Sequence, residues 1–92
     1  MLDIATFIYE AASHLATVRE ALRRQDDGAL RAAVLALRDA SAAAGAERML
    51  ALCTAVRERL ARDGSARIEV LLDAIGQEFD QVVGGLQTAR NA

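Results

Sequence analysis

Two side chains of this 92-residue chain could act as nucleophiles, the single histidine His14 and the single cysteine Cys53. An imidazole nitrogen can accept a phosphoryl group, and a thiolate can take part in redox chemistry. Each stands without a second residue of its own kind. A disulfide framework and a metal site rich in histidine or cysteine are therefore excluded.

Charged side chains offer further candidates for chemistry. Asp26 and Asp27 are adjacent carboxylates at the expected start of a helix, where capping and the helix dipole explain them better than acid–base catalysis. An arginine cluster near the third turn could contact phosphate or an acidic partner, but interleaved acidic residues favour a solvated end of mixed charge. The cluster consists of Arg57, Arg59, Arg62 and Arg67, interleaved with Glu58, Asp63 and Glu69. No Gly-rich phosphate loop, catalytic triad spacing or metal-ligand set is present, so we expect no cofactor.

Composition narrows the class of protein. With 53 % hydrophobic residues and a net charge of −2, the chain is too apolar and too weakly charged to be disordered. Its 11 basic and 13 acidic residues give no overall basic field for nucleic acid. No apolar stretch approaches the ~20 residues of a membrane span, and no signal peptide is recognisable. We expect one soluble, cytoplasmic domain over residues 1–92.

Helices must position these candidates. The chain has 21 Ala and no Pro, a composition that favours helix. Apolar residues recur every three or four positions in four segments, so each segment should bury one face. Short connections between the segments favour an all-α, antiparallel, up-down-up-down four-helix bundle. The four apolar stripes are Ala11, Leu15, Val18 and Leu22; Leu30, Ala33, Val34, Leu37 and Ala44; Met49, Cys53, Val56 and Leu60; and Ile68, Leu71, Ile75, Phe79, Val82 and Leu86.

Turn residues mark the ends of these helices. Asp26 is the expected N-cap of the second helix, and Gly45 can take the left-handed conformation that ends it. Gly64 is expected to close the third helix, and Ser65 to cap the fourth.

The two ends of the chain carry separate expectations. Residues 2–9 form either a short N-terminal helix that covers one end of the bundle or the beginning of the first long helix. Near the other end, Gly84-Gly85 should weaken the last turns of the fourth helix by roughly 1 kcal/mol per Gly relative to Ala. We therefore expect fraying there.

The second helix has a distinctive outward face. Opposite its buried stripe, Leu35 is an apolar side chain expected to point to solvent. Arg31 lies one turn before Leu35 and Arg38 one turn after it. Ala42 continues the same face, and Asp39 lies one turn beyond Leu35. A single exposed leucine is common in folded proteins and by itself needs no functional explanation.

Several short segments then follow one another in a recognisable order between residues 7 and 86. They are residues 15–22, residue 26 with residues 29–31, residues 45–49, the pair 52–53, the turn 63–64 and the stripe from 71 to 79. In this order and spacing the chain resembles the histidine-containing phosphotransfer (HPt) domain family. These domains are four-helix bundles that relay phosphate between receiver domains in bacterial and fungal phosphorelays.

The family motif is His, any residue, Leu, Lys, Gly and a small polar residue on the exposed face of the second helix. It falls here on residues 35–40, where Leu37 matches and Arg38 keeps the positive charge of the Lys. Leu35 stands in place of the phosphoaccepting His, and a leucine has no lone pair with which to attack a phosphoaspartate. Asp39 replaces the Gly and adds bulk and negative charge where a phosphoryl group would sit. The resemblance therefore implies a degenerate HPt domain, or pseudo-HPt.

A pseudo-HPt domain implies a non-enzymatic module of two-component signalling. It would dock the receiver domain of a response regulator, or a hybrid sensor kinase, without accepting phosphate. The docking residues implied are Arg31, Leu35, Arg38, Asp39 and Ala42. In this interpretation Leu35 supplies apolar contact, the two arginines supply charge complementarity, and Asp39 disfavours a phosphorylated partner.

Two other functions stay open. His14 lies at the edge of the first buried stripe, at about the height of Arg38, and could serve as an alternative phosphoacceptor, although a packed boundary histidine is the simpler interpretation. The chain could also be a structural bundle that dimerises or links domains. Cys53 falls within the third buried stripe, where we expect an inert core residue.

Overall fold

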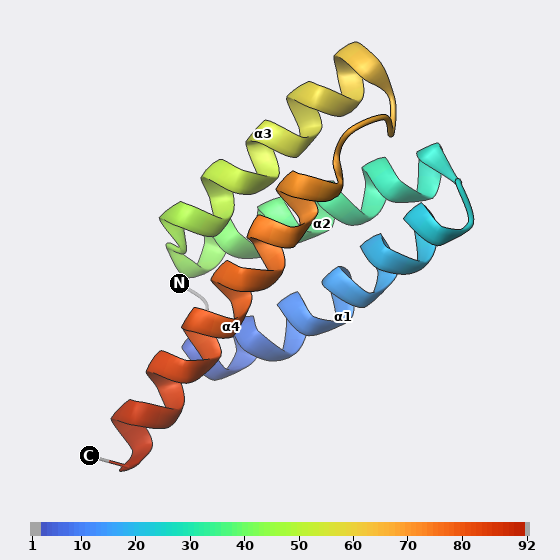
Figure 1. Cartoon of the computed structure of the whole chain (residues 1–92). Coiled ribbons are helices and arrows are strands. Elements are labelled where there is room, and N and C mark those ends of the chain that lie inside the picture. Colours follow the sequence, from blue (N-terminus) through green and yellow to red (C-terminus); the bar gives the residue numbers. More distant parts are fainter. Residues whose placement is uncertain (1–2, 92) are drawn as a thin grey trace.

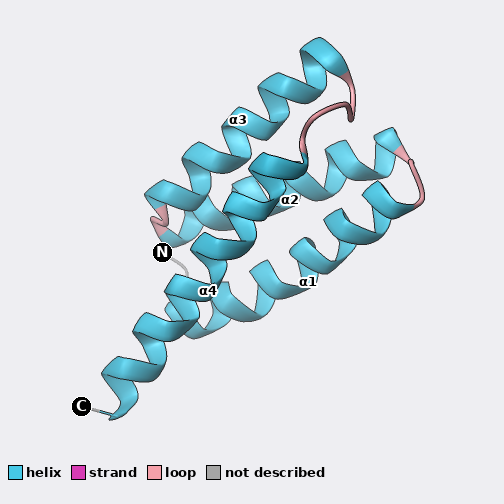
Figure 2. Ribbon diagram, in the orientation of Figure 1, coloured by secondary structure: helices cyan, strands magenta, loops and turns pink. Residues whose placement is uncertain are grey.

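The computed structural model describes residues 3–91, which form four α-helices and no strand. The helices are α1 (Ile4–Arg23), α2 (Asp27–Ala44), α3 (Glu47–Asp63) and α4 (Glu69–Asn91). Each helix packs antiparallel against the next along the chain, and α4 closes the bundle against α1 (Figure 1). Short loops join the helices end to end (Figure 2). The predicted all-α, up-down-up-down four-helix bundle is confirmed.

The N-terminal segment belongs to α1, so the alternative of a separate capping helix is wrong. Asp3 caps α1, because its carboxylate accepts hydrogen bonds from the backbone N–H and the hydroxyl of Thr6, each at 2.9 Å. The Thr6 N–H also lowers the pKa of Asp3 below its ordinary value. Phe7 is fully buried and extends the stripe of Ala11 by one turn, which keeps the helix continuous. Leu2 lies outside the described residues.

The expected boundaries of α2 are confirmed. The carboxylate of Asp26 accepts a hydrogen bond from the Ala29 N–H at 3.0 Å, as an N-cap should. At the other end Gly45 has φ 71° and ψ 24°, the left-handed conformation that stops a helix. Only Gly45 and Ala46 separate α2 from α3, so these two helices form a tight antiparallel pair.

The connection between α3 and α4 differs in part from expectation. Gly64 closes α3 with φ 63° and ψ −146°, and its N–H donates to the Leu60 carbonyl at 3.0 Å. Ser65, however, is not the cap of α4. The chain continues in a turn to Ile68, and α4 begins at Glu69. Ile68 is fully buried, and its carbonyl accepts the first helical hydrogen bond, from the Leu72 N–H at 2.9 Å. Burial of Ile68 therefore sets the start of α4.

The core follows the predicted stripes, with changes near the ends of the helices. Leu72 is more deeply buried than Leu71, because Ile68, Leu72 and Ile75 share one face of α4. Leu22, Ala44, Phe79, Val82 and Leu86 are only half-buried. The buried apolar residues are Phe7, Ala11, Leu15, Val18, Ala21, Leu30, Ala33, Val34, Leu37, Ala40, Met49, Cys53, Val56, Leu60, Ile68, Leu72 and Ile75.

The C-terminal end of α4 projects beyond the bundle, past the N-terminal end of α1 (Figure 1). The helix runs without interruption through Gly84 and Gly85, so the structure itself has no break at the expected point of fraying. A Cβ atom added at either glycine would meet no other atom within 4 Å. Both glycines are therefore positions where conformational freedom weakens a helix without any packing in return.

Replacing Gly85 by Ala should raise the free energy of unfolding by about 0.5–1 kcal/mol, because Ala restricts the unfolded chain and fits the helix without a clash. Urea or thermal unfolding followed by circular dichroism measures the change. Gly45→Ala is the matched control and should instead destabilise by about 1–2 kcal/mol, because its φ of 71° is strained for a residue with a Cβ. A loss of stability in Gly85→Ala would contradict this account of the helix end.

Candidate functional site

The predicted outward face of α2 lies on the surface. Leu35 is 41 % exposed, and Arg31, Asp39 and Ala42 are exposed as well, whereas Arg38 is half-buried. The helical period fixes this arrangement, since Val34 and Leu37 on either side of Leu35 are buried. Within the described residues, the large apolar side chains left exposed are Ile4, Tyr9, Leu35 and Val70.

A groove runs beside Leu35 between α2 and α3, with a volume of about 220 Å³. Ala32 and Leu35 come from α2, and Leu60, which is almost fully buried, comes from α3. These three give the groove an apolar lining. Arg31 on α2 and Arg57 on α3 complete it, one arginine from each helix. We name this surface the α2–α3 groove.

Arg57 is a member of this site that the sequence analysis did not assign to it. The alternation of charges around Arg57 indicated a solvated end, and that pattern carries no information about the neighbouring helix. The short turn between α2 and α3 does indicate which residues of the two helices lie side by side. Leu35 lies ten residues before Gly45 and Arg57 eleven residues after Ala46, so an antiparallel pair brings the two level.

Arg38 and Asp39 interact with each other. The Arg38 Nη1 donates to the Asp39 Oδ1 at 3.2 Å. The pair is on the surface, so it contributes little stability, but it partly balances the charge of Asp39. The Nε of Arg38 is buried, and within the described part of the chain it has no hydrogen-bond partner. Arg38 therefore retains donor capacity that Asp39 does not use.

Arg31 and Arg57 differ from Arg38 in their surroundings. Throughout the part of the chain that the structure describes, neither forms an ion pair with an acidic side chain. The α2–α3 groove therefore has two arginines without an ion pair, Arg31 and Arg57, beside its apolar lining. Such a surface suits an anionic group attached to an apolar one.

His14 is half-buried on α1. The α2–α3 groove has its walls on α2 and α3, so this imidazole does not line it. The structure therefore does not bring the single histidine together with Leu35 and the groove arginines.

Cys53 is fully buried in α3, as expected from its place in the apolar stripe. Burial raises the pKa of its thiol from an ordinary value of 9.0 to about 11, and the positive charge of nearby Arg38 opposes this rise. A thiol held neutral at physiological pH is a poor nucleophile. Cys53 is thus a core residue.

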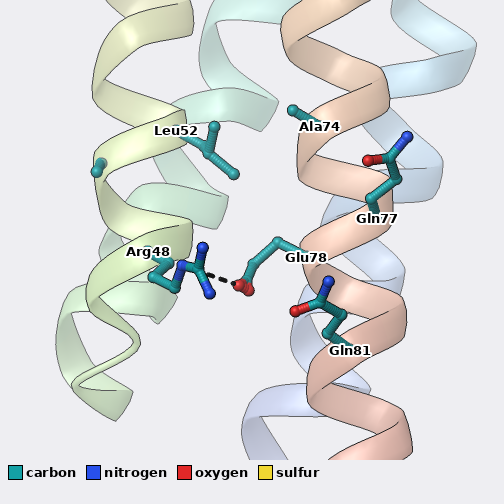
Figure 3. Close-up of a pocket in the computed structure, with 7 residues that line it drawn as sticks. Arg48, Leu52, Ala74, Gln77, Glu78 and Gln81 are labelled. Atoms are coloured by element: carbon teal, nitrogen blue, oxygen red, sulfur yellow. Dashed lines mark ion pairs between the residues drawn. The ribbon is translucent and has the colours of Figure 1, made fainter.

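A second groove lies between α3 and α4, with a volume of about 400 Å³, and no motif in the sequence indicated it. Its lining is mixed, with apolar Leu52 and Ala74 beside polar Gln77 and Gln81. Figure 3 shows Arg48 on α3 pointing across the groove toward Glu78 on α4, where its Nε lies 3.7 Å from the carboxylate. The opposite charges compensate each other, and the lining contains no candidate nucleophile.

The family model described as the Hpt domain matches residues 4–88, which span all but the last turn of the bundle. No curated protein and no solved structure matches the chain. Across residues 3–91, no helix is both long and apolar enough to cross a membrane. The same part of the chain holds no group of three or more His, Cys, Asp or Glu side chains that could bind a metal ion.

Iodoacetamide at about pH 8 should alkylate native Cys53 about 100-fold more slowly than the guanidinium-unfolded chain, since a pKa of about 11 in place of 9.0 leaves that much less thiolate.

The same shift in the pKa of Cys53 makes the stability of the folded chain depend on pH. A raised folded-state pKa means that the neutral thiol's contribution is intact below pH 9 and is lost as the pH rises from about 9 to 11. Urea unfolding measured from pH 9 to 11 should show that the free energy of unfolding declines less steeply with pH in Cys53→Ala than in the wild-type chain. Rapid alkylation of the folded chain would show that the thiol is accessible.

Proposed function

Since the chain belongs to the Hpt domain family, we propose that it is a non-catalytic module that binds a receiver domain or a hybrid sensor kinase without accepting phosphate. Membership of the family assigns the chain to phosphorelay signalling, in which Hpt domains interact with receiver domains and histidine kinases. The proposal concerns what this chain does there.

One observation carries the proposal: Leu35 occupies the motif position of the phosphoaccepting histidine. Transfer from a phosphoaspartate breaks the P–O bond to the carboxylate and forms an N–P bond on the acceptor imidazole. A leucine side chain has no atom that can form that bond. Its 41 % exposure instead leaves an apolar contact at the place where a partner's active site would approach.

The surrounding residues support docking in place of transfer. Arg31 and Arg38 flank Leu35 by one turn on each side and offer positive charge to an acidic partner. Ala42 is small and exposed, so it permits close approach. Asp39 places a carboxylate where the family has Gly, and two like charges ~4 Å apart repel by roughly 1–4 kcal/mol. Because Arg38 partly balances that carboxylate, we assign the exclusion of a phosphoryl group as much to the bulk of Asp39 as to its charge.

A module of this kind would act by occupancy. While bound, it withholds a receiver domain from an active phosphotransfer protein that uses the same surface. Its effect on the pathway then depends on its concentration and affinity relative to that competitor.

Leu35→Glu should weaken binding to a receiver domain at least about tenfold, because it places a charge in the centre of an apolar contact. The measurement is titration calorimetry against purified receiver domains encoded in the same genome. Stability should change by no more than about 0.5 kcal/mol, since the side chain is on the surface.

Val70→Glu is the matched control for this variant. Val70 is also apolar and is 78 % exposed, but it lies on α4, outside the α2–α3 groove. It should leave receiver binding unchanged. If no receiver domain binds the wild-type chain, or if Leu35→Glu binds as tightly as wild type, the docking function is wrong and a structural bundle becomes the better interpretation.

The double variant Leu35→His with Asp39→Gly should acquire acid-labile phosphate when incubated with a phosphorylated receiver domain. It restores both the imidazole and the open approach on a helix face that is already exposed. Radiolabelled phosphate retained on the chain, and lost on acid treatment, measures the transfer. Because Asp is itself a poor helix former, the change from Asp to Gly should cost only about 0.3 kcal/mol in helix stability, which a melting curve measured beside the assay checks.

The wild-type chain and His14→Ala are the controls for that experiment. Both should remain unlabelled. Label on the wild-type chain that disappears in His14→Ala would instead establish His14 as the acceptor and overturn the non-catalytic function.

A further inference from the structure

We propose that the groove between α3 and α4, which we name the α3–α4 groove, is a docking site for a helix of a partner protein that inserts an arginine side chain toward Glu78. This groove lies on a different side of α3 from the α2–α3 groove. In the part of the chain that the structure describes, α2 and α4 each pack against α1 and α3 and not against each other. The inference therefore goes beyond the proposed function and does not depend on it.

Glu78 is the most shielded carboxylate among the ion pairs of residues 3–91. Its side chain is 11 % exposed, whereas those of Glu20, Asp39 and Asp63 are at least half exposed. Removal from water is costly for a carboxylate unless hydrogen bonds or a close counter-charge replace the water. The surroundings of Glu78 therefore decide what the α3–α4 groove can bind.

Arg48 is a loose partner for this carboxylate. Its side chain is 84 % exposed, and its Nε lies 3.7 Å from the Glu78 carboxylate, beyond hydrogen-bond distance (Figure 3). Within the described part of the chain, no side chain donates a hydrogen bond to Glu78. Glu78 thus keeps acceptor sites for a cation that approaches to about 2.7–2.9 Å.

The lining of the groove suits the side chain of an arginine. Leu52 and Ala74 offer carbon surface to its methylene chain, which packs on apolar atoms while the charged end reaches a polar group. Gln77 and Gln81 lie one turn apart on α4, before and after Glu78 in the sequence (Figure 3). Their amide oxygens can accept the guanidinium N–H groups that the carboxylate does not use.

The length of the groove favours a helix over a free cation. A hollow of about 220 Å³ adjoins the main groove of about 400 Å³ and shares Arg48 and Glu78 with it. Together they extend along residues 46–52 and 74–82, which is about 12 Å of helix axis at a rise of about 1.5 Å per residue. One guanidinium fills a small part of that length. Two turns of a helix, with small apolar residues on each side of the arginine, match all of it.

The probe is a pair of helical peptides of about 15 residues, each held helical by a side-chain bridge on its far face. One peptide carries Arg at the centre of a stripe of Ala and Leu, and the other carries Gln in place of that Arg. Titrated into the isotope-labelled full chain, the Arg peptide should shift the backbone resonances of Leu52, Ala74 and Glu78. The Gln peptide should bind at least about tenfold more weakly, because it brings no charge to Glu78.

Variants at the two residues of the ion pair should change the affinity for the Arg peptide in opposite directions. Glu78→Gln should weaken binding at least about tenfold, since it removes the counter-charge and keeps the size of the side chain. Arg48→Ala should strengthen binding about threefold, since it removes the cation that competes for Glu78. The matched controls Asp80→Asn and Arg62→Ala change exposed side chains outside the lining and should leave the affinity within about twofold.

Three results would each overturn the inference. The first is equal affinity of the two peptides. The second is weaker binding in Arg48→Ala, as expected if the ion pair only holds α3 and α4 together. The third is binding of free agmatine, a guanidinium on a short methylene chain, as tight as that of the Arg peptide, because the groove would then be a site for a free cation.

Leu35→Glu keeps this inference separate from the proposed function. The variant should leave the affinity for the Arg peptide unchanged, because Leu35 does not line the α3–α4 groove. Failure of the peptide to bind therefore leaves receiver docking intact. A chain that binds the peptide and no receiver domain would keep this inference and lose the proposed function.

Discussion

The burial of one face of α2 is the constraint on which the rest of the site depends. Val34 and Leu37 are almost completely excluded from solvent, and the helical period then directs Leu35 outward. The same burial fixes the rotation of α2 between α1 and α3, and this rotation places Arg31 and Arg38 at the surface of the bundle, with Arg31 exposed and Arg38 half-buried. Each residue number on this helix therefore corresponds to a fixed place on the surface or in the core, and the type of side chain there decides what chemistry can occur.

The sequence was sufficient for features that depend on local patterns. Periodicity predicted the four helices and the exposure of Leu35, and the caps at Asp26 and Gly45 followed from residue type. Features that depend on contacts between helices were missed. Arg57 was assigned to solvent because charge alternation on one helix says nothing of the next, and Ser65 was taken for a cap because the burial of Ile68 is a tertiary effect. The order and spacing of short segments along the chain indicated the family, and no pattern in the sequence indicated the groove.

The chain thus keeps the helical scaffold of its family. In the function we propose, Leu35 offers no nitrogen that could hold a phosphoryl group. Of the two other reactive side chains, His14 lies on α1, outside the lining of the α2–α3 groove, and Cys53 is buried in the core. What remains on the surface is contact area and charge. Arg31 and Arg57 form no ion pair among the described residues, so an acidic partner would find both guanidinium groups available at the α2–α3 groove.

The two-residue connection between α2 and α3 has a further consequence. Because Gly45 and Ala46 allow no slack, the two walls of the groove are held in one register before any partner arrives. Side chains on such a preorganised surface lose little backbone entropy when a complex forms. For a partner that docked on this surface, the entropy cost of ordering would fall mainly on the partner's own segment, so a preformed segment would have the advantage over one that must fold on contact.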